Sequence, residues 1–397
     1  MKSGKFSLLL IVINLLVLIP RDINGCTTAV ISGSASRNGA PILWKNRDTG
    51  YLSNKIIYVK ESPNSFVAIV NSTETSGRFV YAGLNGEGFA ITNTVAYNLP
   101  KVEEEVHDLE GQIMSDALRT CSTVDDFEKY IKKNLGKSLG SWSTFNVIDG
   151  EGGSTLFEVH NNGYKRYDTS LSEKKYFVVT NFARSGEKDE GAGYLRFEQA
   201  TKLFSELPMQ KIDHQSIFQK ISLYIGNPLV KHPSLIDLKA QPSTSPLWIH
   251  SKNCINRPST AAAVIITGKK KGDLNSIATF WVVLGEPVTS IAVPVWVEAK
   301  SSPVQLHMGE TAPICKESLR IKKIIHPFTE GFKKNYLNIS KLVNRDGGGF
   351  LPAILETESR IFSETAEFLK VKHSPDEFAE FQTKMAEIAL NTLRKIK

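Results

Sequence analysis

Short apolar segments alternate with turn-forming residues through most of the chain. The segments 27–31 and 41–44 have the composition of strands, and Ser, Gly and Asn between them favour a hairpin loop. The Asn85-Gly86 pair favours another tight turn, because both residues tolerate positive φ. The same pattern predicts further strands at 56–60, 66–70, 78–82, 89–93, 142–148, 154–159, 163–167, 176–180, 261–267, 276–284 and 289–297.

Helical patterns lie between the blocks of strands and take over near the C-terminus. Two N-terminal capping signals stand out, Thr123 with Asp126 and Ser374 with Glu377, each acid three residues after the hydroxyl. Runs of strands separated by pairs of helices predict a layered α+β architecture of two antiparallel sheets covered by helices. Helices are expected at 109–121, after Thr123, near 193–206 and 213–224, and in a C-terminal helical appendage.

The first 25 residues are predicted to be an export signal. Lys2 and Lys5 precede an apolar run at 6–19, which is shorter than the roughly 18–20 residues that span a bilayer. We therefore expect an exported protein, periplasmic or secreted, without a permanent membrane span. The expected division is a signal peptide (1–25), a main domain (26–310) and a C-terminal helical extension (311–397).

Cleavage after Gly25 leaves three interpretations of Cys26. It could carry a lipid anchor, although Asn24 fits a lipoprotein cleavage site poorly, so a lipoprotein is the weaker expectation for localisation. It could become a free N-terminal residue with a thiol and an α-amine on one carbon. It could also be a buried structural cysteine.

Composition excludes several classes of protein. The chain has 397 residues, 41% of them hydrophobic and 22% charged, which is ordinary for a globular protein and unlike a disordered one. The formal charge of +7 is mild, and no basic run is interleaved with aromatics, so no nucleic-acid partner is expected. The eight histidines never form an i, i+4 pair and no Cys-x-x-Cys occurs, so neither a metal nor a cofactor is predicted.

Polar residues gather where several predicted strands end. Each of them taken singly fits a turn or a strand stop, because Asn and Asp favour such positions without any chemistry. A hairpin after residue 31 would bring the second strand back beside Cys26. The candidates are Cys26, Lys45, Asp48, Asn93, Asn181 and Arg196.

In this order, the motifs resemble those of a known family. The sequence resembles the linear amide C–N hydrolases of the N-terminal nucleophile (Ntn) superfamily, which include choloylglycine (bile salt) hydrolases, penicillin V acylases, acid ceramidase-like amidases and isopenicillin N acyltransferases. The resemblance covers roughly residues 26–300. It rests on Cys26-Thr27, Lys45-Asn46-Arg47-Asp48, the glycine-rich stretch 83–88 leading to Asn93, Thr180-Asn181 and Arg196-Phe197.

The resemblance implies a four-layer αββα sandwich and a set of catalytic roles. Cys26 would supply the nucleophilic sulfur, and its own α-amine would be the general base. Asp48 would hold the resulting ammonium, and Arg196 would orient the site. The Asn181 side chain and the Asn93 backbone N–H would form an oxyanion hole.

Three details remain open in the sequence. The family has Arg where this chain has Lys45, so either Lys45 or Arg47 fills that role. Arg184 competes with Arg196. A disulfide between Cys254 and Cys315 is the expected pairing if one forms, with free buried thiols as the alternative.

The expected function is that of an exported N-terminal cysteine amidase. It would cleave a linear C–N amide of a small acyl-amide substrate through a thioester on Cys26. Acyl transfer through the same thioester, a dipeptidase of the same superfamily and a lipid-anchored binding protein without catalysis are the alternatives. The sequence leaves a homo-oligomer open.

Overall fold

The computed structural model describes residues 25–100, 108–136, 138–229, 239 and 242–397. Apart from Gly25, the predicted signal peptide lies outside the described residues. No helix in the described ranges is both long enough and apolar enough to cross a bilayer.

Two antiparallel sheets form the centre of the molecule. The six-stranded sheet has the order β10 (Tyr176–Val179), β1 (Thr27–Ile31), β2 (Ile42–Asp48), β12 (Thr260–Thr267), β13 (Thr279–Leu284) and β14 (Val293–Val295). The seven-stranded sheet runs in chain order through β3 (Asn54–Val59), β4 (Phe66–Asn71), β5 (Ala82–Asn85), β6 (Ala90–Val95), β7 (Trp142–Ile148), β8 (Ser154–His160) and β9 (Gly163–Asp168). A separate two-stranded ribbon joins β11 (Trp248–His250) to β15 (Tyr336–Asn338).

The two sheets pack face to face, with β1 and β2 against β6, β7 and β8. Their facing side chains form an apolar core that includes Leu43, Val67 and Leu156. Among the polar contacts between the two sheets, Nδ2 of Asn146 on β7 donates to Oγ1 of Thr28 on β1 at 2.9 Å. A polar bridge therefore joins the sheets close to the start of β1.

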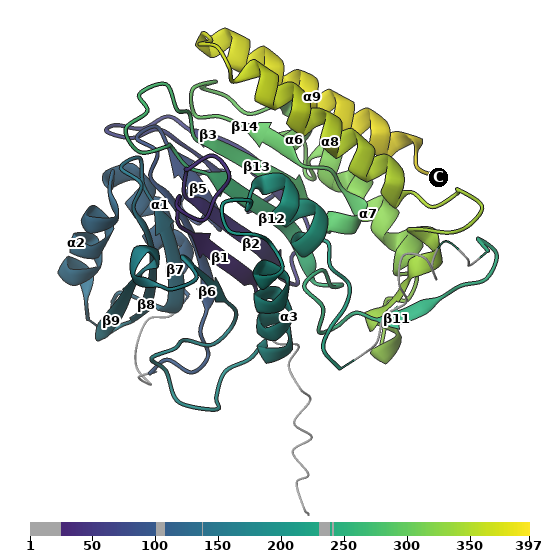
Figure 1. Ribbon diagram of the computed structural model, residues 1–397, viewed down its shortest axis with the longest axis horizontal. Helices are drawn as coiled ribbons and strands as arrows, with labels where there is room; N and C mark the ends of the chain where they lie inside the picture. The colour runs from purple at the N-terminus through teal and green to yellow at the C-terminus, as the bar shows by residue number, and fades with distance from the viewer. Residues whose placement is uncertain (1–24, 101–107, 137, 230–238, 240–241) are drawn as a thin grey trace, which may run out of the picture.

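Helices cover both outer faces of this sandwich (Figure 1). On the seven-stranded sheet lie α1 (Glu110–Thr120) and α2 (Val124–Asn134), which enclose a second apolar core with Phe127 at its centre. On the six-stranded sheet lie α3 (Tyr194–Ser205), α4 (His214–Ser216) with the π-helical turn η2 (Ile217–Ser222), α7 (Pro313–Ile325), α8 (Leu351–Phe368) and α9 (Pro375–Lys395). The short helix α6 (Val304–His307) contacts α7, α9 and strand β3. The predicted αββα arrangement is confirmed.

The capping signals in the sequence mark real helix starts. Thr123 and Asp126 form a capping box at α2, and Ser374 and Glu377 form another at α9. These short-range signals depend on neighbouring residues alone, which explains why the sequence locates them.

Some predicted boundaries are wrong where tertiary contacts decide them. The strand predicted at 78–82 begins instead at Ala82, because the N–H of Val80 donates to the carbonyl of Gly111 on α1 rather than to a strand. The helix predicted at 213–224 is one α-helical turn followed by the π-helical turn η2. The strand predicted at 289–297 shortens to β14 after a 3-10 turn.

The C-terminal helices pack on the edge of the six-stranded sheet. Ile321 of α7, Ile354 of α8 and Leu390 of α9 belong to the same apolar core as the strands β12 and β13. The carboxyl group of Glu358 on α8 accepts a hydrogen bond from the N–H of Ala292 at 3.1 Å. This helical region is therefore one of the layers of the sandwich, whereas a domain boundary at residue 310 stays a prediction.

The pH dependence of stability should report the burial of Glu358. Burial raises the pKa of this carboxyl to about 7. Between its ordinary value and about 7 the folded protein keeps the proton that the unfolded chain has released, so stability falls as pH rises through this window. We expect Glu358→Gln to remove this slope and to be more stable than the original protein at pH 8, by roughly 2–4 kcal/mol. Urea denaturation at several pH values measures it, and parallel pH profiles for the two proteins would contradict it.

Candidate active site

The candidate site lies where β1 begins, in the six-stranded sheet. Thr27 pairs with Asn46 of β2, and Thr28 pairs with Val179 of β10. Continuing these antiparallel registers by one or two residues brings Arg47 and Asn181 level with Cys26. Since side chains alternate between the faces of a strand, Lys45 and Arg47 project from the same face of β2.

Two arginine side chains bind the carbonyl groups of Gly25 and Cys26, the residues on either side of the predicted cleavage point. Nη1 of Arg196 donates to the carbonyl oxygen of Cys26 at 2.7 Å, and Nη2 of Arg257 donates to that of Gly25 at 2.6 Å. A methyl group added at Gly25 would lie 1.9 Å from Oδ1 of Asn181. Only glycine therefore fits before Cys26 without displacing Asn181.

Asp48 is the buried carboxylate that anchors these arginines. Its Oδ2 lies 2.8 Å from Nε of Arg257 and 3.9 Å from Nη1 of Arg196. Its Oδ1 accepts a hydrogen bond from Oγ1 of Thr260 at 2.6 Å. Burial first, and then the positive charge of Arg257, lower the pKa of Arg196 to about 9, against the opposing effect of Asp48.

Arg196, in the first turn of α3, occupies the position beside Cys26. Its Nη1 also donates to Oγ1 of Thr27 at 2.8 Å, and its Nη2 donates to Oδ1 of Asn181 at 2.7 Å. A Cβ on Gly193, which precedes α3 with a φ of 86°, would lie 2.5 Å from Nη2 of Arg196. The competing Arg184 instead donates to the carbonyl of Val178.

Lys45 and Arg47 have different partners on the seven-stranded sheet. Nζ of Lys45 donates to the carbonyl of Tyr81 at 2.8 Å and to Oδ1 of Asn93 at 2.7 Å. Burial lowers the pKa of Lys45 to about 8. The guanidinium of Arg47 lies 3.7 Å above the ring of Tyr81 and donates to Asn54 and Asn71. Lys45 thus contacts a predicted site residue, and the hydrogen bonds of Arg47 go to β3 and β4.

Hydrogen bonds hold both predicted oxyanion asparagines in place. Nδ2 of Asn181 donates to Oγ1 of Thr94 at 3.2 Å and to the carbonyl of Val95 at 2.9 Å. Nδ2 of Asn93 faces Oγ of Ser143 at 3.4 Å, while its Oδ1 accepts from Lys45. With Gly25 in place, the amide donors of Asn181 are directed at β6, so an oxyanion role would need one of them to exchange partners.

Arg257 is the residue that sequence reasoning missed. It precedes β12, and its guanidinium joins Asp48 to the carbonyl of Gly25. A signal was present, because Arg257 stands a few residues before a strongly apolar strand, as the other candidates stand near strand ends. Its proximity to Asp48 depends on β12 pairing with β2, which no local pattern reveals.

The predicted disulfide between Cys254 and Cys315 is wrong, since all four cysteines are free. Sγ of Cys254 donates to the carbonyl of Ile225 at 3.0 Å, and Sγ of Cys315 lies 3.6 Å from the carbonyl of Leu52. Burial raises the pKa of Cys254 to about 12 and that of Cys121 to about 11. Cys26 is the partly exposed thiol, and the other three are buried.

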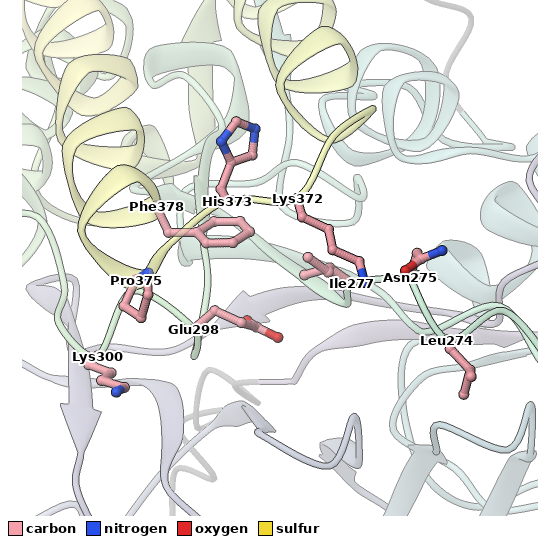
Figure 2. A pocket seen from close by; sticks show the side chains of 9 residues that line it. All are labelled: Leu274, Asn275, Ile277, Glu298, Lys300, Lys372, His373, Pro375 and Phe378. Carbon is pink, nitrogen blue, oxygen red and sulfur yellow. The ribbon is translucent and has the colours of Figure 1, made fainter.

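A surface hollow of about 360 Å³ lies elsewhere on the molecule. Figure 2 shows Glu298 and Lys372 reaching toward it from two different segments, with Ile277 and Phe378 among its other lining residues. It adjoins the loop after β12, whereas Arg257 and Asp48 meet at the start of that strand. The hollow is therefore not part of the candidate site.

Two other chemistries find no support in the described residues. No group of three or more His, Cys, Asp or Glu side chains in that part of the chain could hold a metal ion. The segment 136–140 reads Gly-x-Ser-x-Gly, but it follows helix α2 and precedes strand β7. A nucleophile elbow requires the opposite order, strand before helix.

Comparisons with known proteins found similarity only among solved structures. No protein-family model and no curated protein sequence matches the chain. Penicillin V acylase from Agrobacterium tumefaciens is 15% identical with a TM-score of 0.42, over 68% of this chain and 86% of that one. A variant of conjugated bile acid hydrolase from Clostridium perfringens is 11% identical with a TM-score of 0.38, over 65% and 89%.

A third solved structure, thermostable penicillin G acylase from Alcaligenes faecalis, is 10% identical with a TM-score of 0.36, over 57% of each chain. Penicillin V acylase and bile acid hydrolase are kinds of protein that the sequence motifs resemble. The similarities are low, so the function proposed below rests on the geometry of this chain.

Replacing Asp48 should strongly destabilise the fold. Asp48→Asn keeps the shape of the side chain but leaves Arg257 and Arg196 buried without their carboxylate, which we expect to cost about 3–5 kcal/mol of unfolding free energy. Glu364→Gln is the control, because Glu364 pairs with Arg360 and Lys384 at the surface and should cost less than about 1 kcal/mol. Urea denaturation measures both, and equal losses would show that Asp48 does not anchor the arginines.

Proposed function

We propose that this protein is an exported amidase whose mature chain begins at Cys26. The observation that carries the proposal is that Arg257 and Arg196 bind the carbonyl groups of Gly25 and Cys26, while Asp48 pairs with Arg257. Loss of residues 1–25 would create an α-amine at this point, next to the thiol of the same residue. The clustering of residues chosen independently from the sequence supports this proposal.

The proposed reaction uses groups of this chain alone. The α-amine of Cys26 takes the thiol proton, and the thiolate attacks the carbonyl carbon of a linear amide. The C–N bond of the tetrahedral intermediate then breaks, the amine leaves with the proton held by the α-ammonium, and a thioester remains on Sγ. Water attacks the thioester, releasing a carboxylic acid and restoring the thiol.

The remaining site residues have proposed supporting roles. Asp48 would hold the α-ammonium of Cys26. Arg257 would hold the carbonyl of Gly25, the last residue of the leader, until the leader is released. Arg196 would orient residues 26 and 27, to which it already donates. Asn181 and Asn93 would stabilise the oxyanion. Lys45 would hold Asn93 in place by donating a hydrogen bond to its Oδ1.

A panel of acyl-amides tests the proposed reaction class. The protein beginning at Cys26 is incubated with amides that differ in acyl group and amine, and release of the amine is followed. Hydrolysis of at least one supports the proposal, whereas acyl products formed with an added amine would favour the transferase alternative. Intact mass is measured in parallel, since a mass increase from acyl chains at Cys26 would favour the lipid-anchored alternative.

Cys26→Ser should remain folded and lose nearly all activity. A serine hydroxyl at this site is far less ionised near neutral pH than a thiol and only weakly activated, so we expect a loss of at least about 10²-fold in kcat. Cys121→Ser is the matched control, because Cys121 is the buried C-cap residue of α1 in the second apolar core, and its replacement should leave kcat unchanged. Steady-state rates measure both variants, and full activity of Cys26→Ser would exclude the thiol as nucleophile.

Retention of Gly25 should abolish activity without unfolding the protein. Two chains are compared, one beginning at Gly25 and one at Cys26. In the longer chain the nitrogen of Cys26 is an amide that cannot accept the thiol proton, although the thiol is intact. We expect identical circular dichroism and turnover only in the shorter chain. Equal turnover would mean that a side chain is the base.

A further inference from the structure

The segment that carries Arg257 has no helix or strand of its own. Residues 251–259 lead into β12 through turns and bends, so no ladder of helix or strand hydrogen bonds fixes their conformation. The N–H of Arg257 donates to Oγ1 of Thr260 at 3.0 Å, and the N–H of Thr260 donates to the carbonyl of Arg257 at 2.8 Å. These bonds hold one end of the segment only.

Asn256 holds the other side of Arg257. Its N–H donates to the carbonyl of Tyr224 at 3.0 Å, and its Oδ1 accepts from the N–H of Val288 at 3.3 Å. Its Nδ2 donates to Oε1 of Glu286 at 2.6 Å. The last bond is charge-assisted, because Glu286 is ionised, and such bonds are about twice as strong as neutral ones.

Glu286 is completely buried between Lys322 and His326 in the C-terminal region. Nζ of Lys322 on α7 lies 2.6 Å from its Oε2, and Nε2 of His326, which follows α7, lies 3.1 Å from its Oε1. Burial alone would raise the pKa of Glu286, but the charges of Lys322 and His326 prevail and lower it to about 2. The carboxylate is therefore present at any physiological pH.

We propose that Glu286 is a positioning residue for the candidate active site, acting through Asn256 on the adjacent Arg257. Asn256 is the link, because it is bonded to Glu286 and is covalently joined to the residue that contacts Asp48 and Gly25. Helix α7 thereby supports the site from the C-terminal region. The kinetic test of this inference rests on the proposed amidase function. A second test, by hydrogen exchange, is independent of that function.

The kinetic test is a double-mutant cycle. Glu286→Gln keeps an oxygen for Asn256 but removes the charge that Lys322 requires, and we expect kcat to fall about tenfold. In a protein that already carries Arg257→Lys, the same change should alter kcat less than about twofold, because the residue it positions is gone. A merely structural role would lower kcat by the same factor in both proteins.

Glu358→Gln is the matched control for this cycle. Glu358 is also a fully buried carboxylate that accepts from a backbone N–H, but its partner is Ala292, outside the 251–257 segment. We expect Glu358→Gln to leave kcat unchanged when it is added to the original protein and when it is added to the protein that carries Arg257→Lys. If Glu358→Gln lowered kcat as Glu286→Gln does, the effect would belong to any buried carboxyl group and the inference would be overturned.

Hydrogen exchange of the full-length chain tests the same inference without any activity. The backbone amides of residues 254–257 should exchange several-fold faster in Glu286→Gln than in Glu358→Gln, when both are measured under strongly stabilising conditions. Unchanged exchange in this segment would overturn the inference whatever the kinetics show. Faster exchange in a protein that hydrolyses no amide would contradict the proposed function alone.

Discussion

The carboxylate of Asp48 compensates the charge of two guanidinium groups that lie buried at one end of the six-stranded sheet. Without it, Arg257 and Arg196 would each carry an uncompensated charge in a region that excludes water, which proteins rarely tolerate. Arg257 in turn holds the carbonyl of Gly25, and Arg196 holds that of Cys26. The position of the candidate nucleophile thus follows from where Asp48 sits.

The fold could be read from the sequence wherever local chemistry decides it. Short apolar segments between turn-forming residues predicted most of the strands, and the capping boxes at Thr123 and Ser374 located two helix starts. The strand predicted at 78–82 starts later than expected for a non-local reason. The N–H of Val80 donates to the carbonyl of Gly111, a residue distant along the chain. Boundaries of that kind depend on partners that a pattern of neighbouring residues does not contain.

The candidate site shows the same division between local and distant causes. Cys26 and Asn181 both lie at the ends of predicted strands, and the register of β1 with β10 brings them level. Lys45 and Arg47 share one face of β2, so the position along the strand does not distinguish them. Their hydrogen-bond partners do, because Lys45 donates to Asn93 and Arg47 donates to Asn54 and Asn71. Cys254 and Cys315 were paired by residue type, but the fold gives each thiol a backbone carbonyl of its own.

The position of β12 beside β2 also sets an order of events during synthesis. Asp48 and Arg257 are 209 residues apart in the chain, and they meet only through this pairing. A ribosome that has produced the first hundred residues has released Cys26 and Asp48 but not Arg196, Arg257 or Thr260. Contacts at such separation form late in folding. Any reactivity that depends on the anchored arginines therefore cannot begin in the growing chain before β12 has paired with β2.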